Sequence, residues 1–146
     1  MSDLFFKIVN PVVKTLLRSP LHGAMSHNTV LLEFTGHKSG RSLSTPVSYV
    51  INDNELQCFT SHPWWKNLRQ GKEITLVLRG KRRKGTPTVT VNEPETIAEA
   101  LAPFLVLVPR DAPHAEVSLD ANGQADSADI KRAAQRLVLV TIKLTD

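Results

Sequence analysis

The segment TGHKSGR, residues 35–41, combines the side chains and the backbone freedom that an anion-binding loop needs. Its two glycines allow positive φ angles, which can turn successive N–H groups toward one ligand. Lys38 and Arg41 add two positive charges, and Ser39 adds a hydroxyl donor. This set of groups suits a phosphate or a carboxylate. The spacing is not that of a P-loop, and a solvated hairpin tip is the alternative interpretation.

A second segment, SHPWWKNL, places two tryptophans next to each other at positions 64 and 65. Neighbouring residues of a helix point about 100° apart, so Trp64 and Trp65 cannot occupy one face. We expect one ring to pack in the core and the other to line a groove or contact a ring of a ligand. The segment itself is typical of one or two helical turns that stop at Gly71.

Several other chemistries lack a matching pattern. The five histidines have no zinc-ligand spacing, and Cys58 is the only cysteine, so we expect neither a metal site nor a disulfide within the chain. Cys58 lies in a strand-like run and is expected to be a small buried apolar residue. Cysteine usage of this kind favours a cytoplasmic location. No nucleophile and base pair up in a way that would indicate hydrolysis.

Positive charge is concentrated in RGKRRKG, residues 79–85, which carries five basic residues in a chain of net charge +4. Binding to nucleic acid is not expected, because no aromatic platform accompanies these side chains. A solvated hairpin turn is one interpretation of the segment. Attraction of an anionic ligand tail is the other.

These candidate residues must be positioned by a chain that is rich in short strands. Apolar and β-branched runs predict strands at about 29–35, 44–52, 55–60, 73–79, 83–91 and 137–144. A helix is predicted from position 93 with a break near Pro103, and a second helix over 127–136. Residues 109–128 are expected to form a loop with little regular structure. The pattern indicates one α+β domain over residues 1–146, built as a small antiparallel barrel or a strongly curved sheet.

The first twenty residues predict an amphipathic helix, followed by a barrel over 28–146. Apolar side chains recur at three- and four-residue spacings, and Pro11 is expected to kink the helix. The helix is expected to cover the core, to act as a lid, or to make a weak membrane-surface contact through its basic residues. Its interrupted apolar pattern is not that of a signal peptide, and no run reaches the roughly 20 apolar residues of a membrane span.

The two candidate segments together resemble a known family. TGHKSGRSLSTPVSYV, followed by SHPWWKNL and then ITLVLRGKRRKG, is similar to the deazaflavin (coenzyme F-420)-dependent nitroreductases. The resemblance covers nearly the whole chain and is strongest in G-x-K-[ST]-G-x(5)-P and W-x-x-N-L. It implies a split β-barrel of about six mainly antiparallel strands, with an N-terminal helix and peripheral helices.

The resemblance also implies roles for individual residues. The phosphate-bearing tail of the cofactor would lie on Lys38, Ser39, Gly40 and Arg41, with Trp64, Asn67 and Leu68 closing the phosphate end. The backbone of Pro46, Val47 and Ser48 would lie beside the ring system. Apart from the resemblance, Tyr49 or Ser48 is a candidate to donate a proton or a hydrogen bond to the substrate, and we expect no single acid or base to be indispensable. His37 stands where the family commonly has an arginine, and Tyr49 is the only tyrosine, so the tyrosine-lined pocket of nitroimidazole-activating relatives is missing.

The function implied by the resemblance is hydride transfer from reduced deazaflavin to a small molecule. The acceptor would be an activated alkene, a quinone or a nitro compound. Two alternatives stay open at this point: an FMN-binding reductase of the same fold, and a non-enzymatic module that holds a lipid or haem. The cofactor carries the reaction in this chemistry, so the protein chiefly has to position groups and exclude water.

Overall fold

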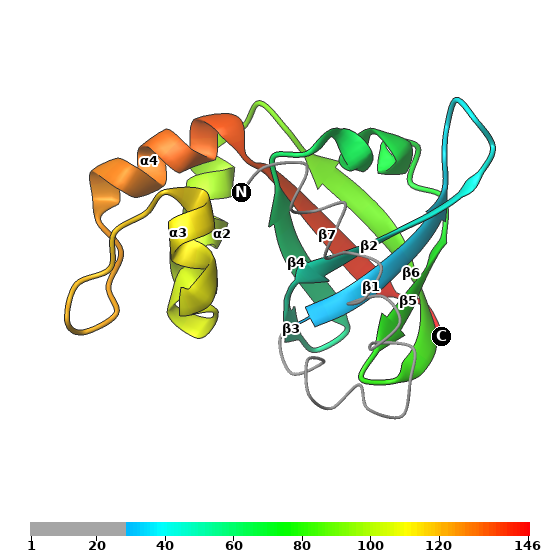
Figure 1. Ribbon diagram of the computed structural model, residues 1–146, viewed down its shortest axis with the longest axis horizontal. Coiled ribbons are helices and arrows are strands. Elements are labelled where there is room, and N and C mark those ends of the chain that lie inside the picture. The colour runs from blue at the N-terminus through cyan, green and yellow to red at the C-terminus, as the bar shows by residue number, and fades with distance from the viewer. Residues whose placement is uncertain (1–28) are drawn as a thin grey trace.

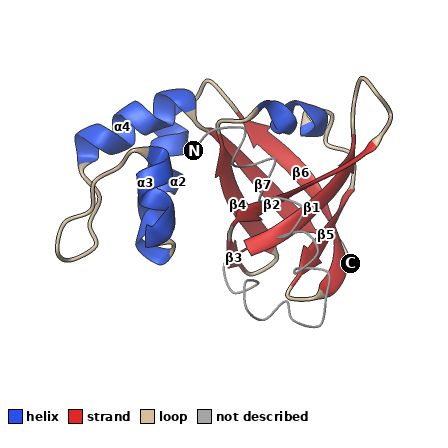
Figure 2. Cartoon of the chain, in the orientation of Figure 1, coloured by secondary structure: helices blue, strands red, loops and turns tan. Residues whose placement is uncertain are grey.

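A computed structural model describes residues 29–146 of the 146-residue chain. The predicted helix over residues 1–20, with its lid or membrane-surface role, lies outside the described residues. The described part consists of a curled sheet and a group of helices beside it (Figures 1 and 2). None of the described helices is long and apolar enough to cross a membrane.

The sheet has seven strands, and each pairs with its neighbours in the antiparallel sense. Their order in the sheet is β2-β1-β5-β6-β7-β4-β3. The strands are β1 (Thr29–Thr35), β2 (Ser42–Ser48), β3 (Val50–Asn52), β4 (Glu55–Thr60), β5 (Ile74–Leu78), β6 (Lys81–Thr90) and β7 (Val138–Leu144). The antiparallel barrel is therefore confirmed, with seven strands rather than about six.

The extra strand arises because the predicted strand 44–52 is wrong as a single element. The chain leaves one edge of the sheet at Ser48 and joins the opposite edge at Val50. Tyr49 between them is only 3 % exposed and belongs to the barrel core. One continuous run of strand-forming residues thus forms both edge strands of the sheet, β2 and β3. The sheet curls so that these two edges meet at Tyr49.

The basic segment 79–85 is mostly strand rather than turn. Arg79 and Gly80 form a two-residue turn with φ angles of 51° and 79°. Positive φ at both positions is the geometry of a type I′ hairpin, which matches the twist of the flanking strands. The next four basic residues begin β6, so this strand starts earlier than the predicted residue 83.

The helices form a separate group, called here the helical lobe: α2 (Pro94–Leu107), the 3₁₀ helix η3 (Pro109–Asp111), α3 (Ala112–Ala115) and α4 (Ser127–Arg136). The break predicted at Pro103 is wrong, since α2 continues through it. Pro103 and Glu99, one turn before it, both lie on the exposed face of the helix. The Glu99 carbonyl that loses its helical partner there can be hydrated, which lowers the cost of an internal proline.

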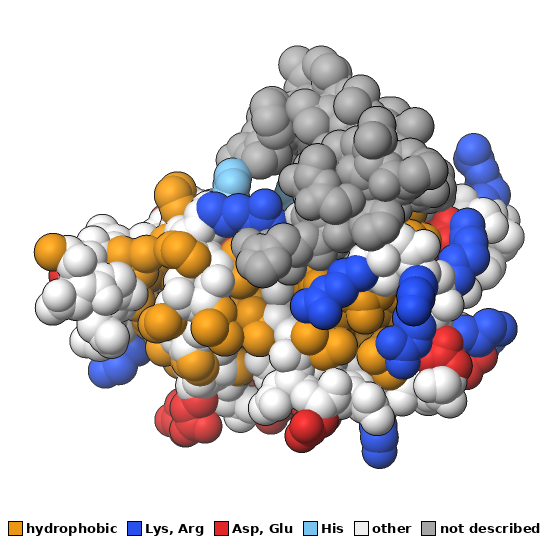
Figure 3. Space-filling view, turned by 90° about the horizontal axis from the view of Figure 1, so that it is seen from below, with side chains coloured by type: hydrophobic (Ala, Val, Ile, Leu, Met, Phe, Trp, Pro, Cys, Tyr) orange, Lys and Arg blue, Asp and Glu red, His pale blue; other side chains and the backbone are white. Residues whose placement is uncertain are grey.

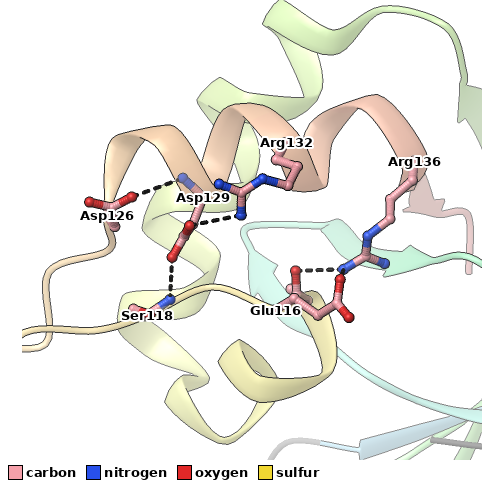
Figure 4. Close-up of polar contacts among 7 residues, drawn as sticks. Glu116, Ser118, Asp126, Asp129, Arg132 and Arg136 are labelled. Carbon is pink, nitrogen blue, oxygen red and sulfur yellow. Dashed lines mark hydrogen bonds and ion pairs between the residues drawn. The ribbon is translucent and has the colours of Figure 1, made fainter.

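The expectation of an irregular segment over 109–128 holds only in part, because η3 and α3 occupy its beginning. Hydrogen bonds then attach the remaining loop to α4 (Figure 4). The Asp129 carboxylate accepts from the Ser118 amide at 2.9 Å and from Arg132 at 2.9 Å. Asp126 caps α4 by accepting from the Asp129 amide at 3.0 Å. The predicted helix 127–136 is confirmed with this cap.

Two apolar cores meet along β7. Residues Val138, Val140, Ile142 and Leu144 point into the barrel core, whereas Leu139 belongs to the core of the helical lobe. Side chains alternate across a strand, so the start of β7 is buried on both faces, whereas Thr141 is half-buried and Lys143 is exposed further along. The lobe also reaches the barrel through Phe104, whose ring lies edge-to-face with that of Phe59, 4.9 Å between centroids. On the face drawn in Figure 3, hydrophobic side chains gather over the lobe, and Lys and Arg gather over the barrel.

Gly85 tests how tightly β6 and β7 are packed. A Cβ at this position would lie 2.5 Å from the Cγ2 of Ile142 and 3.1 Å from the Lys143 carbonyl oxygen. Gly85→Ala is therefore expected to lower the free energy of unfolding by about 1–3 kcal/mol, the usual cost of overpacking a core. Urea unfolding measures the change. Ile142→Leu moves the branch away from Cβ, so Gly85→Ala should cost less in that background. Equal costs in both backgrounds would contradict this account.

Candidate functional site

A cavity of about 230 Å³ lies where the barrel meets the helical lobe. Residues of β2, the end of β4, the 3₁₀ helix η2 (Pro63–Leu68), α2 and α3 line it. The lobe contributes apolar side chains, among them Leu101, Phe104 and Leu105. Polar side chains come mainly from the barrel and from the start of α3. A ligand in this cavity would therefore have apolar walls around its body and a few polar contacts at its edges.

One wall of the cavity is an edge strand. The cavity is lined by four residues of β2: Thr45, Pro46, Val47 and Ser48. Among the described strands, β2 pairs only with β1. Pro46 cannot donate a backbone hydrogen bond, so an edge is where a strand tolerates it. Backbone groups on the outer side of β2 consequently face the gap between the two sheet edges. The three residues predicted to lie beside a cofactor ring are together at the cavity.

The two tryptophans of η2 occupy different surroundings. Trp64 lines the cavity and lies against Phe34, with 6.0 Å between ring centroids. Trp65 lies under two cations, with Lys66 Nζ at 5.9 Å and Arg69 Cζ at 5.3 Å from the ring centroid. Both rings are half-buried against the barrel core. The division of the pair between two environments follows from their angular separation.

Asn67 joins η2 to the cationic loop. Its side-chain nitrogen donates to the Trp64 carbonyl at 2.9 Å, and its oxygen accepts from the His37 amide at 2.8 Å. These two backbone groups fix which end of the amide is which. The same oxygen lies 2.6 Å from His37 Nδ1, so Nδ1 carries a proton. The structure thus brings together the two segments whose combination carries the sequence resemblance.

The loop over residues 36–41 is closed by its own backbone. The Gly36 amide donates to the Arg41 carbonyl at 2.8 Å, and the Gly40 amide, at φ +70°, donates to the Gly36 carbonyl at 2.9 Å. The Arg41 amide donates to Ser39 Oγ at 3.2 Å. With His37 bound to Asn67, four amides of the loop already have protein acceptors. Anion binding here would rest mainly on side-chain charge rather than on a nest of free amides.

Lys38 and Arg41 supply that charge. Both side chains are exposed, and neither forms an ion pair with a residue of the described range 29–146. The basic residues of β6 differ in this respect. Arg82 pairs with Glu33, Arg83 with Asp146 at 2.9 Å, and Lys84 lies 3.8 Å from Glu73.

Of the second basic segment, only the Arg79–Gly80 turn lies at the opposite end of β1 from the 36–41 loop, because β6 runs back along β5 until Lys84 is level with Glu33. In the register of β1 and β5, Glu33 is opposite Thr75 and Leu31 is opposite Val77. The Arg79–Gly80 turn therefore lies beyond the start of β1, whereas the 36–41 loop follows its end (Figure 1). The solvated-hairpin interpretation therefore fits the turn itself, while the β6 residues Arg82, Arg83 and Lys84 are offset by acidic neighbours.

A polar cluster at the cavity connects the lobe to the barrel. Ser48 Oγ donates to Asp111 Oδ1 at 3.0 Å, and Arg110 donates to Ser48 Oγ at 3.2 Å and to Thr29 Oγ1 at 2.7 Å. Burial raises the pKa of the Asp111 carboxyl, while its bond to Ser48 and the nearby Arg110 and His114 oppose the rise. Asp111 and His114 both line the cavity. Sequence reasoning missed them because they lie in a segment without a motif, 63 positions from Ser48.

Three further residues singled out in the sequence lie in the barrel core. Tyr49 is 3 % exposed and Leu68 is 2 % exposed, and neither lines the cavity. Leu68 anchors η2 beneath the tryptophans. Cys58 is fully buried, as predicted, and burial raises the pKa of its thiol to about 12. No group of three or more metal-ligating side chains comes together within residues 29–146.

Solved structures share this architecture. An F-420-H2-dependent reductase (FDR-A) is 19 % identical and superposes with a TM-score of 0.52, over 82 % of this chain and 95 % of that chain. A presumed pyridoxamine 5′-phosphate oxidase from Listeria innocua is 10 % identical, with a TM-score of 0.53 over 92 % of this chain and 94 % of that chain. The chain has the split-barrel fold. No protein-family profile and no curated protein sequence matches it.

A titration of stability tests the environment of Asp111. Its pKa is raised above 3.8 in the folded state, so the folded protein holds the proton to higher pH than the unfolded chain does. The contribution of this carboxyl to stability is full below pH 3.8 and falls as pH rises through the folded pKa. Asp111→Asn removes the titration and retains an acceptor for Ser48. The difference in unfolding free energy, wild type minus variant, is expected to decrease across that window and then level off. Parallel urea-unfolding curves at every pH would contradict the raised pKa.

Proposed function

We propose that the chain is an oxidoreductase that binds a reduced deazaflavin of the coenzyme F-420 type. The ring system enters the cavity beside β2, and the phosphate-bearing tail lies on Lys38, Ser39, Gly40 and Arg41. The single observation that carries the proposal is the Asn67–His37 contact, which attaches the wall of the cavity to a cationic loop whose charges form no ion pair within residues 29–146. A split-barrel fold shared with an F-420-H2-dependent reductase supports it.

The dimensions of the site favour an extended anionic ligand. Ligand sites commonly measure about 300–1,000 Å³, so a cavity of about 230 Å³ takes only part of such a molecule. The rest must lie outside. Strand β2 runs from the loop to the cavity, and at about 3.3 Å per residue the seven steps from Arg41 to Ser48 span about 23 Å. A ring with a long phosphorylated side chain has this shape.

The chain's own residues would bind the cofactor, orient the acceptor and shield the cavity from water. A bound deazaflavin supplies a hydride, and the acceptor would be an activated alkene, a quinone or a nitro compound. Phe59, Phe104 and Leu101 exclude water from the cavity, which strengthens the polar contacts inside it. Asp111 and His114 stand at the cavity where a proton could be supplied to the reduced product. Tyr49, the other candidate donor, would have to act from within the core.

FMN is the second candidate cofactor, because a pyridoxamine 5′-phosphate oxidase-like protein has the same fold. FMN carries one phosphate on a shorter chain, so it would use the cationic loop less fully. A third candidate is a binding module for haem, favoured by His62 and His114 at the cavity, since histidine is a common axial ligand of haem iron.

Titration of the purified protein with coenzyme F-420, FMN and haem, side by side, tests the proposal. We expect F-420 to bind most tightly, followed by FMN. Single-turnover oxidation of the reduced, bound cofactor by an enone or a quinone should be faster than that of free cofactor. Preference for FMN would replace the deazaflavin assignment, and haem binding without cofactor oxidation would replace the enzyme assignment.

Lys38→Ala tests the role of the loop. A charge-assisted hydrogen bond contributes about 1.5–3 kcal/mol. Lys38 is exposed, so its contribution is expected at the lower end of this range. The variant should therefore bind F-420 about tenfold more weakly. Its stability should barely change. Lys81→Ala is the matched control, because Lys81 is exposed at the other end of β1. Fluorescence titration at two ionic strengths measures both, and the wild type should lose affinity as salt rises. An equal effect of the two variants would remove the loop from the proposal.

A further inference from the structure

Thr45 carries the one buried side-chain polar atom without a hydrogen-bond partner among the described residues, its Oγ1. The residue is 3 % exposed, and it lines the cavity. Burying a hydroxyl without a partner forfeits its hydration, so folded proteins contain few such groups. The hydroxyl therefore needs a partner that residues 29–146 do not provide.

The register of β2 shows where this hydroxyl lies. Thr45 is opposite Leu32, and Val47 is opposite Val30, both of which belong to the barrel core. Residues paired across an antiparallel ladder share a face, so Thr45 lies on the inner face of the barrel wall at the cavity. It is held there by the ladder between β1 and β2 and cannot turn outward to water.

Two other hydroxyls of the cavity wall are already engaged, and a third, that of Ser61, belongs to a residue exposed to solvent. Ser48 donates to Asp111, and Thr60 Oγ1 accepts from the His62 amide at 3.0 Å. Among the described residues, Thr45 is thus the buried hydroxyl of this wall that keeps its full hydrogen-bonding capacity for a ligand. A polar group held in place in this way fixes the orientation of what enters the cavity.

We propose that the Thr45 hydroxyl is the anchor of the bound ring and donates a hydrogen bond to a carbonyl oxygen at the ring's polar edge. The inference rests on the proposed function, because flavins and deazaflavins both carry carbonyl groups along one edge of the ring system. It adds a specific contact, made by a residue that the sequence motif does not single out. The hydroxyl is positioned in advance by the sheet, so binding requires no rearrangement of the wall.

The test is Thr45→Val, which keeps the shape of the side chain and removes the hydroxyl. In the protein without ligand, the variant should melt at a higher temperature, because an unsatisfied buried group is gone. Its affinity for F-420, or for FMN if that cofactor binds better, should fall roughly 3- to 10-fold, the usual effect of one neutral hydrogen bond. Stability and affinity are thus expected to change in opposite directions.

Thr60→Val is the matched control, since Thr60 is 6 % exposed in the same wall and has a partner. Loss of the Thr60 hydroxyl should lower the melting temperature and leave the affinity for the cofactor within about twofold of the wild-type value. Thr45→Val with unchanged affinity, or with a lower melting temperature than the wild type, would overturn the anchor role alone. A wild-type protein that binds neither F-420 nor FMN would overturn the proposed function and the anchor together.

Discussion

The structure depends on a closure made by one residue. Strands β2 and β3 are the two edges of a seven-stranded sheet, yet only Tyr49 separates them in the chain. The sheet must therefore curl until its edges meet, and the join is covalent rather than a ladder of hydrogen bonds. A closed ladder would use both sides of β2. Within residues 29–146 one side of β2 stays unpaired, and the buried Tyr49 side chain lies at the corner between β2 and β3. This unpaired side forms a wall of the cavity.

The helical lobe supplies the walls of the cavity that the unpaired edge of β2 does not supply. The start of β7 contributes Val138 and Val140 to the barrel core and Leu139 to the lobe core, so the lobe packs on the sheet through this strand. Phe104 on Phe59 and Asp111 on Ser48 then extend the contact to β4 and β2. One of these contacts is apolar and the other is polar, and the cavity lies between them. The cavity has a mixed lining because the helical lobe supplies mainly apolar side chains to one wall and the barrel supplies polar side chains to the other.

Local patterns predicted much of the fold from the sequence, and they failed where distant segments decide the outcome. Hydrophobic alternation located five strands and the helix over 127–136 with small errors at their ends. It could not show the division at Tyr49, because both halves are equally strand-forming and only sheet closure separates them. The helix break predicted at Pro103 is absent, because a helix tolerates an internal proline when the carbonyl that loses its partner lies on the exposed face, which the local sequence does not show. The sequence motif identified the 36–41 loop and η2. Asp111 and Thr45 were not identified, because the first is distinguished by its hydrogen bond with the distant Ser48 and the second by the absence of a partner within residues 29–146.

Charge distribution gives the loop over 36–41 its significance. Segment 79–85 holds more basic residues, yet acidic neighbours from β1, the C-terminus and the start of β5 offset three of them. A positive charge with a nearby carboxylate attracts an anion weakly, because the two opposite fields largely cancel at distances greater than the separation of the pair. Salt screens what remains beyond about 8 Å. Lys38 and Arg41 have no such partner among residues 29–146, and the bond from Asn67 to His37 attaches their loop to the cavity wall. Unbalanced charge and the cavity therefore lie at one end of the barrel, which is the arrangement that the proposed ligand, a ring with an anionic tail, requires.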